Sequence, residues 1–383
     1  MKKLKQILLW LVGITFSFII IFIGAVFGRQ MAHAAYSFDT FVAKSPLHVL
    51  DSATTAPRGL SPNVIKNIYH LPASGGAGTI AIITAYHDPT IENDLAVFDV
   101  QFGLDPCTTK NKCFTRHVIS SDTASNSGWS LETSLDVEWA HAIAPKAKIL
   151  LVEAPTPSGK NLIKAIDYAR AQKDVVAISM SFGGDEFSDE ATLDSHFTSA
   201  SNGNPNLTFF AASGDDGTGV SWPAVSPNVV GVGGTGLVLR KNIFASEHAW
   251  QGSGGGVSLY EPQPYYQTTY SIPRANHMRA VPDVAYNADP SSGYSVYKTT
   301  GTSGKGWYVV GGTSAGAPQW AAISTLGHDA NNSKFYADKS SLYTASFFRD
   351  IVSGANGDCT YYCDAHKRYD YVTGLGSPLT VNF

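Results

Sequence analysis

The sequence has few charged residues. Asp, Glu, Lys and Arg make up 15% of its 383 residues, against about 25% in a typical soluble domain. The formal net charge of −4 is small and no block of like charges occurs, so nucleic acid is not expected as a partner. A hydrophobic fraction of 44% supports a sizeable core, in one large domain or two smaller ones. Low charge density is also compatible with a protein that works in acid.

Cysteine is scarce as well. The four cysteines form two close pairs in the sequence, Cys107 with Cys113 and Cys359 with Cys363. Four cysteines allow three connectivities, and the sequence alone does not choose between them. Two local disulfides, each pinning a surface loop, are the expectation for an exported chain. A four-thiolate zinc site is the alternative, but neither pair has C-x2-C spacing.

The N-terminal region predicts export. A basic stretch, MKKLKQ, precedes an almost continuously apolar run over residues 7–28, and small residues follow at 32–35. These features predict a cleaved signal peptide over residues 1–34. The run is also long enough to span a bilayer, so a membrane tether through residues 7–28 is the alternative. Either way the rest of the chain is expected outside the cell. Residues 35–58 are polar and are predicted to be a short, irregular linker or pro-segment.

Predicted strands and helices alternate after residue 59. Apolar runs typical of strands buried on both faces occur at 78–86, 147–154, 175–183, 207–215 and 228–235. Helical spacing occurs at 91–103, 129–145, 161–172 and 189–200. This alternation predicts one α/β domain over residues 59–383, with a mainly parallel central sheet. Residues 236–310 are expected to add antiparallel strands and loops.

A candidate nucleophile stands in the stretch GGTSAGAPQWAA. Ser314 lies there among small residues, in front of a predicted helix. None of the 11 histidines is followed by glycine, and the first predicted strand carries Thr84 where a subtilisin has its aspartate. A Ser-His-Asp triad of the subtilisin type is therefore disfavoured. A neutral-pH serine hydrolase that uses one of the histidines remains an alternative.

A carboxyl pair offers another base. Glu132 and Asp136 are four residues apart on the predicted helix 129–145, so they share one face. Like charges at this spacing are screened by solvent or share a proton. A shared proton would let Glu132 act as general base for Ser314 while Asp136 orients it. The alternative is a plain acidic surface. Glu138 is expected to point elsewhere.

A third acidic group follows a predicted strand, in SGDDG at residues 213–217. Asp215 or Asp216 then lies at the carboxyl end of the sheet, where sites form in such folds. An aspartate beside glycine is most often a turn residue. The functional alternative is an oxyanion donor, and a carboxylic acid donates a hydrogen bond only when protonated. Such a donor would work in acid and fail at neutral pH.

Ordered motifs from about residue 59 to the C-terminus resemble the sedolisin family of serine-carboxyl peptidases. They are LETSLD, SMSFGG, SGDDG, SPNVVGVGGT, SGGGVS, VPDVAYNADP, GGTSAGAP and YDYVTGLGSP. The resemblance implies a subtilisin-like three-layer fold and an acid-acting endopeptidase that hydrolyses polypeptides through an acyl-enzyme. It implies Ser314 as nucleophile, Glu132 as general base, Asp136 as the acid that orients it, and Asp215 as oxyanion acid. His141 is then a core or surface histidine.

The resemblance also implies two binding sites. Main-chain pairing with an extended substrate is expected at Ser181, Phe182, Gly183, Ser253, Gly254 and Gly255. One Ca²⁺ site is implied near the C-terminus, formed by oxygens of Asp350, Ile351, His366, Arg368 and Asp370. The family usually has glycine at the positions of His366 and Arg368, and a positive φ suits arginine poorly. The alternative is a pair of surface aspartates in turns.

One departure leaves a second class of function open. Family members usually carry a large N-terminal pro-domain, whereas only residues 35–58 separate the expected cleavage site from the domain here. An exported, non-catalytic peptide-binding protein on a peptidase fold is therefore the alternative to an enzyme. The four matching catalytic residues favour the enzyme, and a monomer is expected.

Overall fold

The computed structural model describes residues 37–301, 304–327, 330–337 and 346–383. The expected signal peptide or anchor, residues 1–34, lies outside these residues. None of the helices described is both long and apolar enough to cross a membrane.

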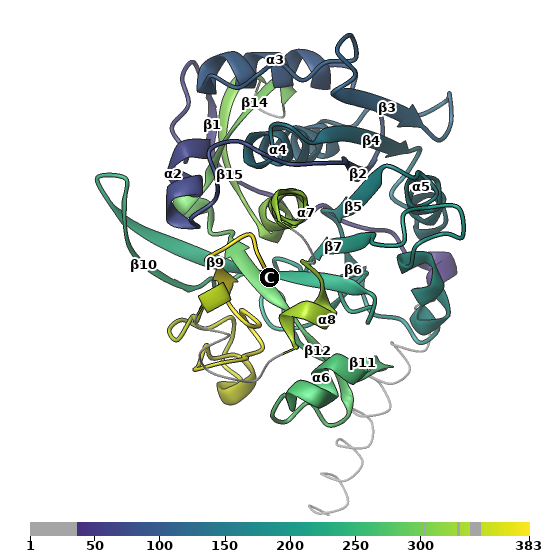
Figure 1. Ribbon diagram of the computed structural model, residues 1–383, viewed down its shortest axis with the longest axis vertical. Coiled ribbons are helices and arrows are strands. Elements are labelled where there is room, and N and C mark those ends of the chain that lie inside the picture. Colours follow the sequence, from purple (N-terminus) through teal and green to yellow (C-terminus); the bar gives the residue numbers. More distant parts are fainter. Residues whose placement is uncertain (1–36, 302–303, 328–329, 338–345) are drawn as a thin grey trace, which may run out of the picture.

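An eight-stranded sheet runs through the centre of the molecule (Figure 1). The neighbouring strands from β9 to β3 pair in parallel, β13 pairs in parallel with β9, and β10 pairs with β9 as an antiparallel hairpin. The order across the sheet is β10 (Ile243–Ala249), β9 (Val229–Arg240), β7 (Thr208–Ala212), β5 (Val175–Met180), β2 (Thr79–Ala85), β4 (Lys148–Ala154) and β3 (Phe114–Val118), with β13 (Val284–Asn287) beside β9. The mainly parallel sheet expected from the sequence is confirmed.

Helices cover both faces of this sheet. Two helices, α4 (Ser127–Ile143) and α7 (Gly316–Leu326), pack on one face, α3 (Ile91–Phe102) packs outside α4, and α5 (Gly159–Arg170) covers the other face. A hydrophobic core lies on each face of the sheet, and alternate residues of β2 point into one or the other. Ile80 and Ile82 face α4 and α7, whereas Ala81 and Ile83 face α5. This is the three-layer arrangement of a subtilisin-like fold.

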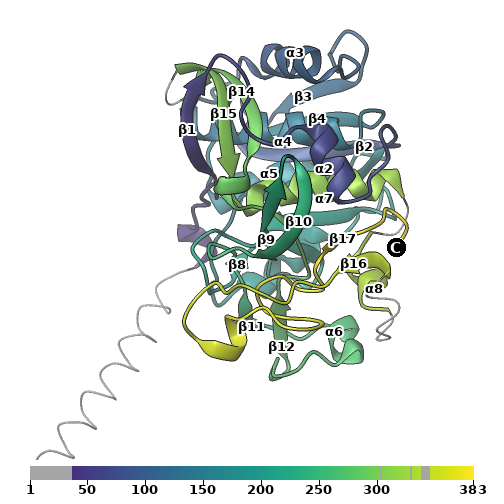
Figure 2. The same cartoon turned by 90° about the vertical axis from the view of Figure 1, so that its left-hand side faces the viewer.

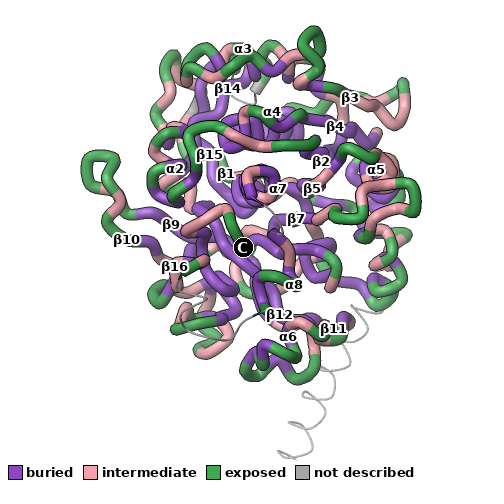
Figure 3. The backbone as a smooth tube through the Cα atoms, in the orientation of Figure 1, coloured by how far each residue is buried: buried purple, intermediate pink, exposed green. Residues whose placement is uncertain are grey.

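The central helices are buried along their length (Figure 3). Every residue of α4 from Trp129 to Ile143 is buried, including four ionisable side chains. Asn126 caps its N-terminus, because its side chain accepts hydrogen bonds from the backbone N–H groups of Gly128 and Trp129. The alternative of an acidic, solvated face is therefore wrong, and the buried acids need a physical explanation.

Shorter elements complete the fold. The expected antiparallel strands after residue 236 are present. They belong to the pairs β11 (Gly256–Pro262) with β12 (Met278–Val281), and β14 (Tyr294–Gly301) with β15 (Gly304–Gly311). The segment 189–200 forms a 3₁₀ helix, Glu190–Phe197, rather than the expected α-helix. Apart from β1 and short 3₁₀ turns, the other elements described are α2 (Pro62–Ile68), α6 (Tyr265–Tyr270), α8 (Asn332–Phe335), β6 (Gly184–Asp185), β8 (Ser221–Trp222), β16 (Phe348–Arg349) and β17 (Ser377–Pro378).

The described part of the expected linker is built into the domain. Its strand β1 (His48–Thr54) pairs antiparallel with β15, as Figure 2 shows, so it is not irregular. Upstream of β1, Val42 bridges to Ser158 and Lys44 bridges to Gly183. The polar composition concealed this role, because main-chain pairing places no strict demand on side chains.

Candidate active site

Ser314 lies in a single 3₁₀ turn between β15 and α7. Its Oγ donates a hydrogen bond of 2.8 Å to the backbone oxygen of Pro46. A Cβ atom on Gly312 would lie 2.1 Å from that oxygen and 2.5 Å from Oδ2 of Asp215, and the φ of Gly312 is 124°. Glycine at this position therefore leaves room for a carbonyl oxygen beside both Ser314 and Asp215.

Glu132 and Asp136 lie on α4, the helix that packs against α7. Oε2 of Glu132 accepts a hydrogen bond from the hydroxyl of Ser45. Oδ1 of Asp136 accepts one of 2.6 Å from Ser181, whose Oγ also lies 3.0 Å from the backbone oxygen of Ser314. Ser181 therefore ties the acid pair to the turn that carries Ser314.

Burial raises the pKa values of both carboxyls. For Glu132 burial raises the pKa, while the neighbouring hydroxyls of Ser45 and Ser314 oppose the rise. Burial, and then the charge of Glu132, raises the pKa of Asp136 well above its ordinary value. Oε1 of Glu132 and Oδ2 of Asp136 are both buried without a described hydrogen-bond partner. These properties indicate that both carboxyls keep their protons to higher pH than exposed carboxyls do, and the shared proton stays a prediction.

Asp215 follows β7 at the carboxyl edge of the sheet. Its Oδ1 accepts hydrogen bonds from the backbone N–H of Thr313 at 2.8 Å and from the Thr313 hydroxyl at 2.7 Å. Its Oδ2 lies 3.2 Å from Nε2 of His48. Burial raises the pKa of Asp215, whereas His48 and Thr313 oppose that rise. The fixed Oδ1 leaves Oδ2 as the oxygen that a proton can occupy.

The two expected substrate-binding stretches have different surroundings. Gly183 makes two main-chain hydrogen bonds with Lys44, at 2.9 and 3.1 Å. The stretch 253–255 instead packs against the loop that carries Asp215: Ser213 donates to the backbone oxygen of Gly254 at 2.8 Å, and Gly255 bridges to Gly219. The pairing of 253–255 with an extended peptide stays a prediction.

Sequence reasoning missed several residues that lie at this site. Ser45, Pro46 and His48 contact the candidate catalytic groups, yet nothing in the polar segment 35–58 signals such a role. The role of Thr313, which positions Asp215, could have been considered from the sequence, because Thr313 immediately precedes the candidate nucleophile. Their common feature is that each contact joins residues far apart in the chain.

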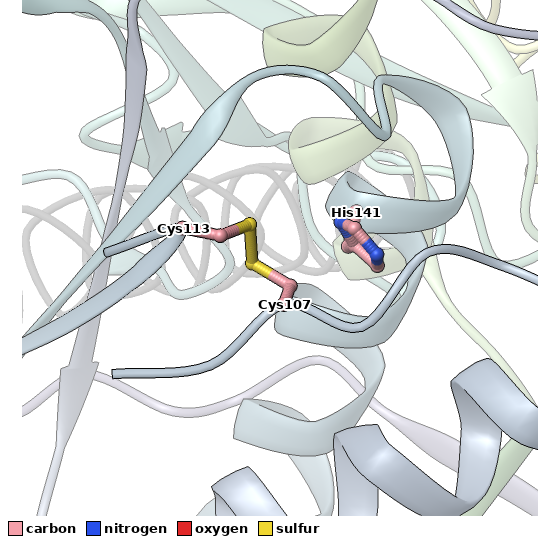
Figure 4. A group of neighbouring side chains, drawn as sticks. All are labelled: Cys107, Cys113 and His141. Carbon is pink, nitrogen blue, oxygen red and sulfur yellow. A yellow bond between two sulfur atoms is a disulfide. The ribbon is translucent and has the colours of Figure 1, made fainter. Parts of the chain in front are cut away.

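His141 is a core residue. It is buried, its Nε2 lies 2.9 Å from the backbone oxygen of Asp105, and burial lowers its pKa. It lies beside Cys107 and Cys113 in an arrangement compact enough for a metal ion, but the two sulfurs are bonded to each other (Figure 4). Cys359 and Cys363 form the second disulfide. The two local disulfides are confirmed and the four-thiolate zinc alternative is wrong.

The expected calcium ligands lie together near the C-terminus. Both carboxylate oxygens of Asp350 accept from the backbone N–H of Arg368, at 3.0 and 3.1 Å, and Oδ2 of Asp370 accepts from that of His366 at 3.3 Å. Arg368 does adopt a left-handed conformation, with φ of 67°. Burial raises the pKa of Asp370 to about 7 and also raises that of Asp350. Asp370 is buried and Asp350 is half-buried. Carboxylate oxygens are ligands of the kind that calcium takes, and the calcium site stays a prediction.

Comparison with known proteins agrees with this geometry. Residues 121–351 match the subtilase family. Kumamolisin of Bacillus sp. strain MN-32 is 31% identical over 86% of this chain and 64% of its own length. Sedolisin of Pseudomonas sp. strain 101 is 26% identical over 93% of this chain and 65% of its own length. The chain thus spans slightly less than two thirds of either relative.

A solved structure extends the likeness to three dimensions. Pseudomonas sedolisin, a serine-carboxyl proteinase complexed with two molecules of pseudo-iodotyrostatin, superposes with a TM-score of 0.70 at 26% identity, covering 84% of this chain and 96% of that one. Sphericase, at 18% identity and a TM-score of 0.52, shares the fold. The chain belongs to the subtilase family and, within it, to the sedolisins.

Proposed function

We propose that this protein is an exported serine-carboxyl endopeptidase that hydrolyses polypeptides in acid through an acyl-enzyme on Ser314. The observation that carries the proposal is the arrangement around one carbonyl. The backbone oxygen of Pro46 accepts a hydrogen bond from Ser314. This oxygen and Oδ2 of Asp215 both lie in the space that the missing side chain of Gly312 leaves open. A peptide carbonyl thus meets a nucleophile and a carboxyl that can donate a hydrogen bond.

The acid pair would supply the base. When Glu132 and Asp136 hold one proton between them, the remaining charge on Glu132 accepts the proton of Ser314 as its Oγ attacks the carbonyl carbon. Glu132 then returns the proton to the leaving amine, and water hydrolyses the ester. In this reaction Asp136 is a positioning residue, because it orients Glu132 and does not touch the substrate.

Asp215 would stabilise the tetrahedral intermediate. Its Oδ2, protonated, donates to the oxygen that develops negative charge, together with the backbone N–H of Ser314. The donor function is present below the pKa of Asp215 and is lost as the pH rises through it. Because burial raises that pKa, the acid form persists to higher pH than for an ordinary aspartate.

The surroundings of Ser314 also support internal rather than terminal cleavage. The main chain that contacts Ser314 through Pro46 extends back past Lys44 to Ala43, whose N–H donates to the oxygen of Pro157 at 2.8 Å, and to Phe41. An enzyme that removes short peptides from an N-terminus needs a barrier in that direction. A site that accommodates further residues there suits an endopeptidase.

The test is the rate at which the protein cleaves an unfolded polypeptide from pH 2 to 8. Activity confined to acid is expected, with loss in Ser314→Ala and Glu132→Ala. The matched control is Glu138→Gln, since Glu138 lies on the same helix, is buried, and accepts from the backbone of Tyr297 instead. Activity near neutrality that survives Glu132→Ala would favour a histidine-dependent hydrolase. A folded protein that binds peptides without cutting them would favour the non-catalytic alternative.

Calcium is proposed as a structural ion. Carboxylate oxygens of Asp350 and Asp370 and carbonyl oxygens of Ile351, His366 and Arg368 would hold it, and the ion would offset the cost of burying the carboxylate of Asp370. Chelation by EGTA is expected to lower the melting temperature, by an amount equivalent to about 2.7 kcal/mol where calcium stood at a hundred times its dissociation constant. Asp370→Asn should abolish that response. A melting temperature indifferent to calcium would contradict the site.

Export is proposed from the N-terminal sequence together with the sedolisin membership. Secretion after cleavage near residue 34 and tethering through residues 7–28 differ in the mass of the mature chain. The N-terminal sequence of the protein recovered from its producing cells distinguishes them. Sedimentation of the same material tests the expected monomer.

A further inference from the structure

A buried histidine lies beside one of the two disulfides (Figure 4). Sγ of Cys107, Sγ of Cys113 and one ring nitrogen of His141 all lie within 4.8 Å of one another. In the part of the chain that the structure describes, this is the one group of three such side chains at metal-ligand spacing. Two thiolates and an imidazole are ligands that zinc takes in proteins. The bond between the sulfurs keeps them from acting as ligands, because a metal binds the thiolate.

Neighbouring groups hold His141 in one orientation. The residue lies on α4 and is fully buried, and its Nε2 lies 2.9 Å from the backbone oxygen of Asp105, so Nε2 carries the proton. Nε2 also lies 3.5 Å from Oδ1 of Asp99. Nδ1 is therefore the nitrogen with a lone pair, and it is buried without a described hydrogen-bond partner. A metal-bound histidine usually donates its other ring N–H to a carbonyl or a carboxylate in this way.

The loop that carries the two cysteines is held by hydrogen bonds of its own. Oδ1 of Asn111 accepts from the backbone N–H groups of Thr108 and Cys113, at 3.1 and 3.0 Å. The backbone N–H of Cys107 donates to Oδ2 of Asp99 at 3.2 Å. None of these bonds involves a sulfur atom, so they hold the two cysteines near each other after the disulfide is reduced. Ligands that are positioned in advance lose less entropy when they bind an ion.

We propose that the reduced form of this protein binds one zinc ion through Cys107, Cys113 and His141, with water as the fourth ligand. Two thiolates neutralise the charge of the ion, so the site needs no further counter-charge. Asp99 orients the ring of His141 and the amide of Cys107 and does not bind the ion. The site is independent of the proposed peptidase function, because none of its residues takes part in that reaction.

The exchange of the disulfide for a metal ion requires a two-electron reductant. A phosphine and one water molecule reduce the bond between the sulfurs, which gives two thiols and a phosphine oxide. Both thiol protons pass to the solvent as zinc binds. The disulfide closes a loop between residues six apart in the sequence. The ion also ties that loop to α4, so it joins two parts of the fold that the disulfide does not.

Cobalt is the probe for thiolate ligands, because their bonds to Co²⁺ give a charge-transfer absorption band. The full-length protein is reduced with a phosphine, freed of the phosphine and of oxygen, and titrated with Co²⁺ at neutral pH. The band is expected to be complete at one equivalent of Co²⁺, and Zn²⁺ should then displace the cobalt. The oxidised protein should show no band. A reduced, folded protein without the band overturns the proposal.

Substitutions test which side chains bind the ion. Cys113→Ser removes one thiolate from a half-buried position and should abolish the cobalt band. His141→Gln should weaken Zn²⁺ binding more than about a hundredfold, the upper range for an outer-shell group. The matched control replaces the other pair, Cys359→Ser with Cys363→Ser, and should leave the affinity unchanged. An affinity that survives Cys113→Ser, or that is lost in the control, overturns the assigned ligands.

The role of Asp99 has a separate readout. Asp99→Asn should weaken Zn²⁺ binding by about ten- to a hundredfold, the usual cost of losing a group that orients a ligand. The cobalt band at saturation should remain, because the two thiolates still bind the metal. Loss of the band at saturation would overturn the orienting role.

Thiol labelling compares the two cysteine pairs within one molecule and does not depend on any substitution. Zn²⁺ is expected to slow the alkylation of Cys107 and Cys113 in the reduced protein at least about tenfold, because a metal-bound thiolate is not free to react. Alkylation of Cys359 and Cys363 should stay unchanged. Mass spectrometry of the peptides measures both pairs. Equal protection of the two pairs, or protection of neither, overturns the proposal.

Discussion

Buried carboxyl groups in this molecule fall into two sets with different neighbours. Asp88 and Asp94 both contact the ammonium of Lys298, at 2.6 and 2.7 Å, in a site closed to solvent. The pKa of Glu132 is set instead by burial, two hydroxyls and another carboxyl. A charge compensated by a cation stays fixed and shapes the fold. Carboxyls buried with one another hold protons, so they can exchange them with a substrate or with the solvent.

The second set includes another cluster, formed by Glu186, Glu190, Asp194 and Glu261. Burial, and then the charge of neighbouring Glu186, raises the pKa of Glu190 to about 10. Burial and the charges of Asp194 and Glu186 raise the pKa of Glu261 to about 8. None of these groups contacts Ser314 in the described hydrogen bonds. Buried carboxyl groups in this molecule therefore occur in three situations. Some are paired with a cation, some are protonated beside the nucleophile, and some are protonated away from it.

The largest effect is expected where a protonated pair does chemistry. Glu132→Gln removes the base but preserves the shape and the burial, so the cleavage rate should fall up to about ten-thousandfold. The melting temperature should not fall, because an amide carries no charge to desolvate. Paired measurements of rate and melting temperature check this, with Glu138→Gln as control. A large fall in melting temperature would show that Glu132 stabilises the fold, as Asp88 and Asp94 do.

The next effect concerns the cation-paired set. Lys298→Met leaves Asp88 and Asp94 buried without their cation, and the free energy of unfolding should fall by about 3–5 kcal/mol. Chemical denaturation measures it. The matched control is Lys146→Met, which breaks an exposed pair with Asp105 and should cost about 1 kcal/mol or less. Equal losses in the two variants would erase the distinction between compensated and exposed pairs.

Asp215 offers a test of the proton itself. Asp215→Ala should lower the rate by about a hundred- to a thousandfold, the usual cost of one oxyanion donor. Asp215→Asn keeps a donor at every pH, so its activity should persist to higher pH than that of the unmodified protein, whose acid donor is lost as the pH rises through the Asp215 pKa. The pH–rate profiles of the two variants and of the unmodified protein test both expectations. An unchanged upper limb in Asp215→Asn would show that another group sets it.

The smallest effect is expected in the cluster away from the nucleophile. The pKa of Glu261 is raised from 4.5 to about 8, so the folded state binds more protons than the unfolded state between these values. Its stabilising contribution is complete below about pH 4.5 and is lost as the pH rises toward 8. Glu261→Gln should therefore raise the free energy of unfolding by about 1–2 kcal/mol at pH 8 and leave it unchanged at pH 4. Asp122→Asn, at an exposed position, should change neither.

The sequence predicted those parts of the molecule that rest on local pattern. Runs such as 78–86 and 147–154 predicted buried strands, because hydrophobic residues on both faces require cover from both sides. The spacing of Glu132 and Asp136 predicted a shared face of one helix, and the structure places both beside the turn that carries Ser314. The ordered motifs then predicted which serine and which aspartate to consider.

What escaped prediction depends on distant main-chain contacts. The pairing of Lys44 with Gly183 joins residues whose side chains say nothing about it, and β1 pairs with a strand more than two hundred residues away. The burial of Glu190 and Glu261 was equally unpredictable, because a single glutamate in a sequence shows no pattern that separates a buried position from a solvated one. Such features follow from topology, which decides which loops meet at one edge of the sheet.

The pairing of β1 with β15 has a consequence for the order in which the molecule can form. β15 runs into the turn that carries Ser314, and its partner β1 lies more than two hundred residues earlier in the chain. Protein synthesis proceeds from the N-terminus, so β1 emerges long before the strand with which it pairs. This sheet can therefore form only when most of the chain has been made.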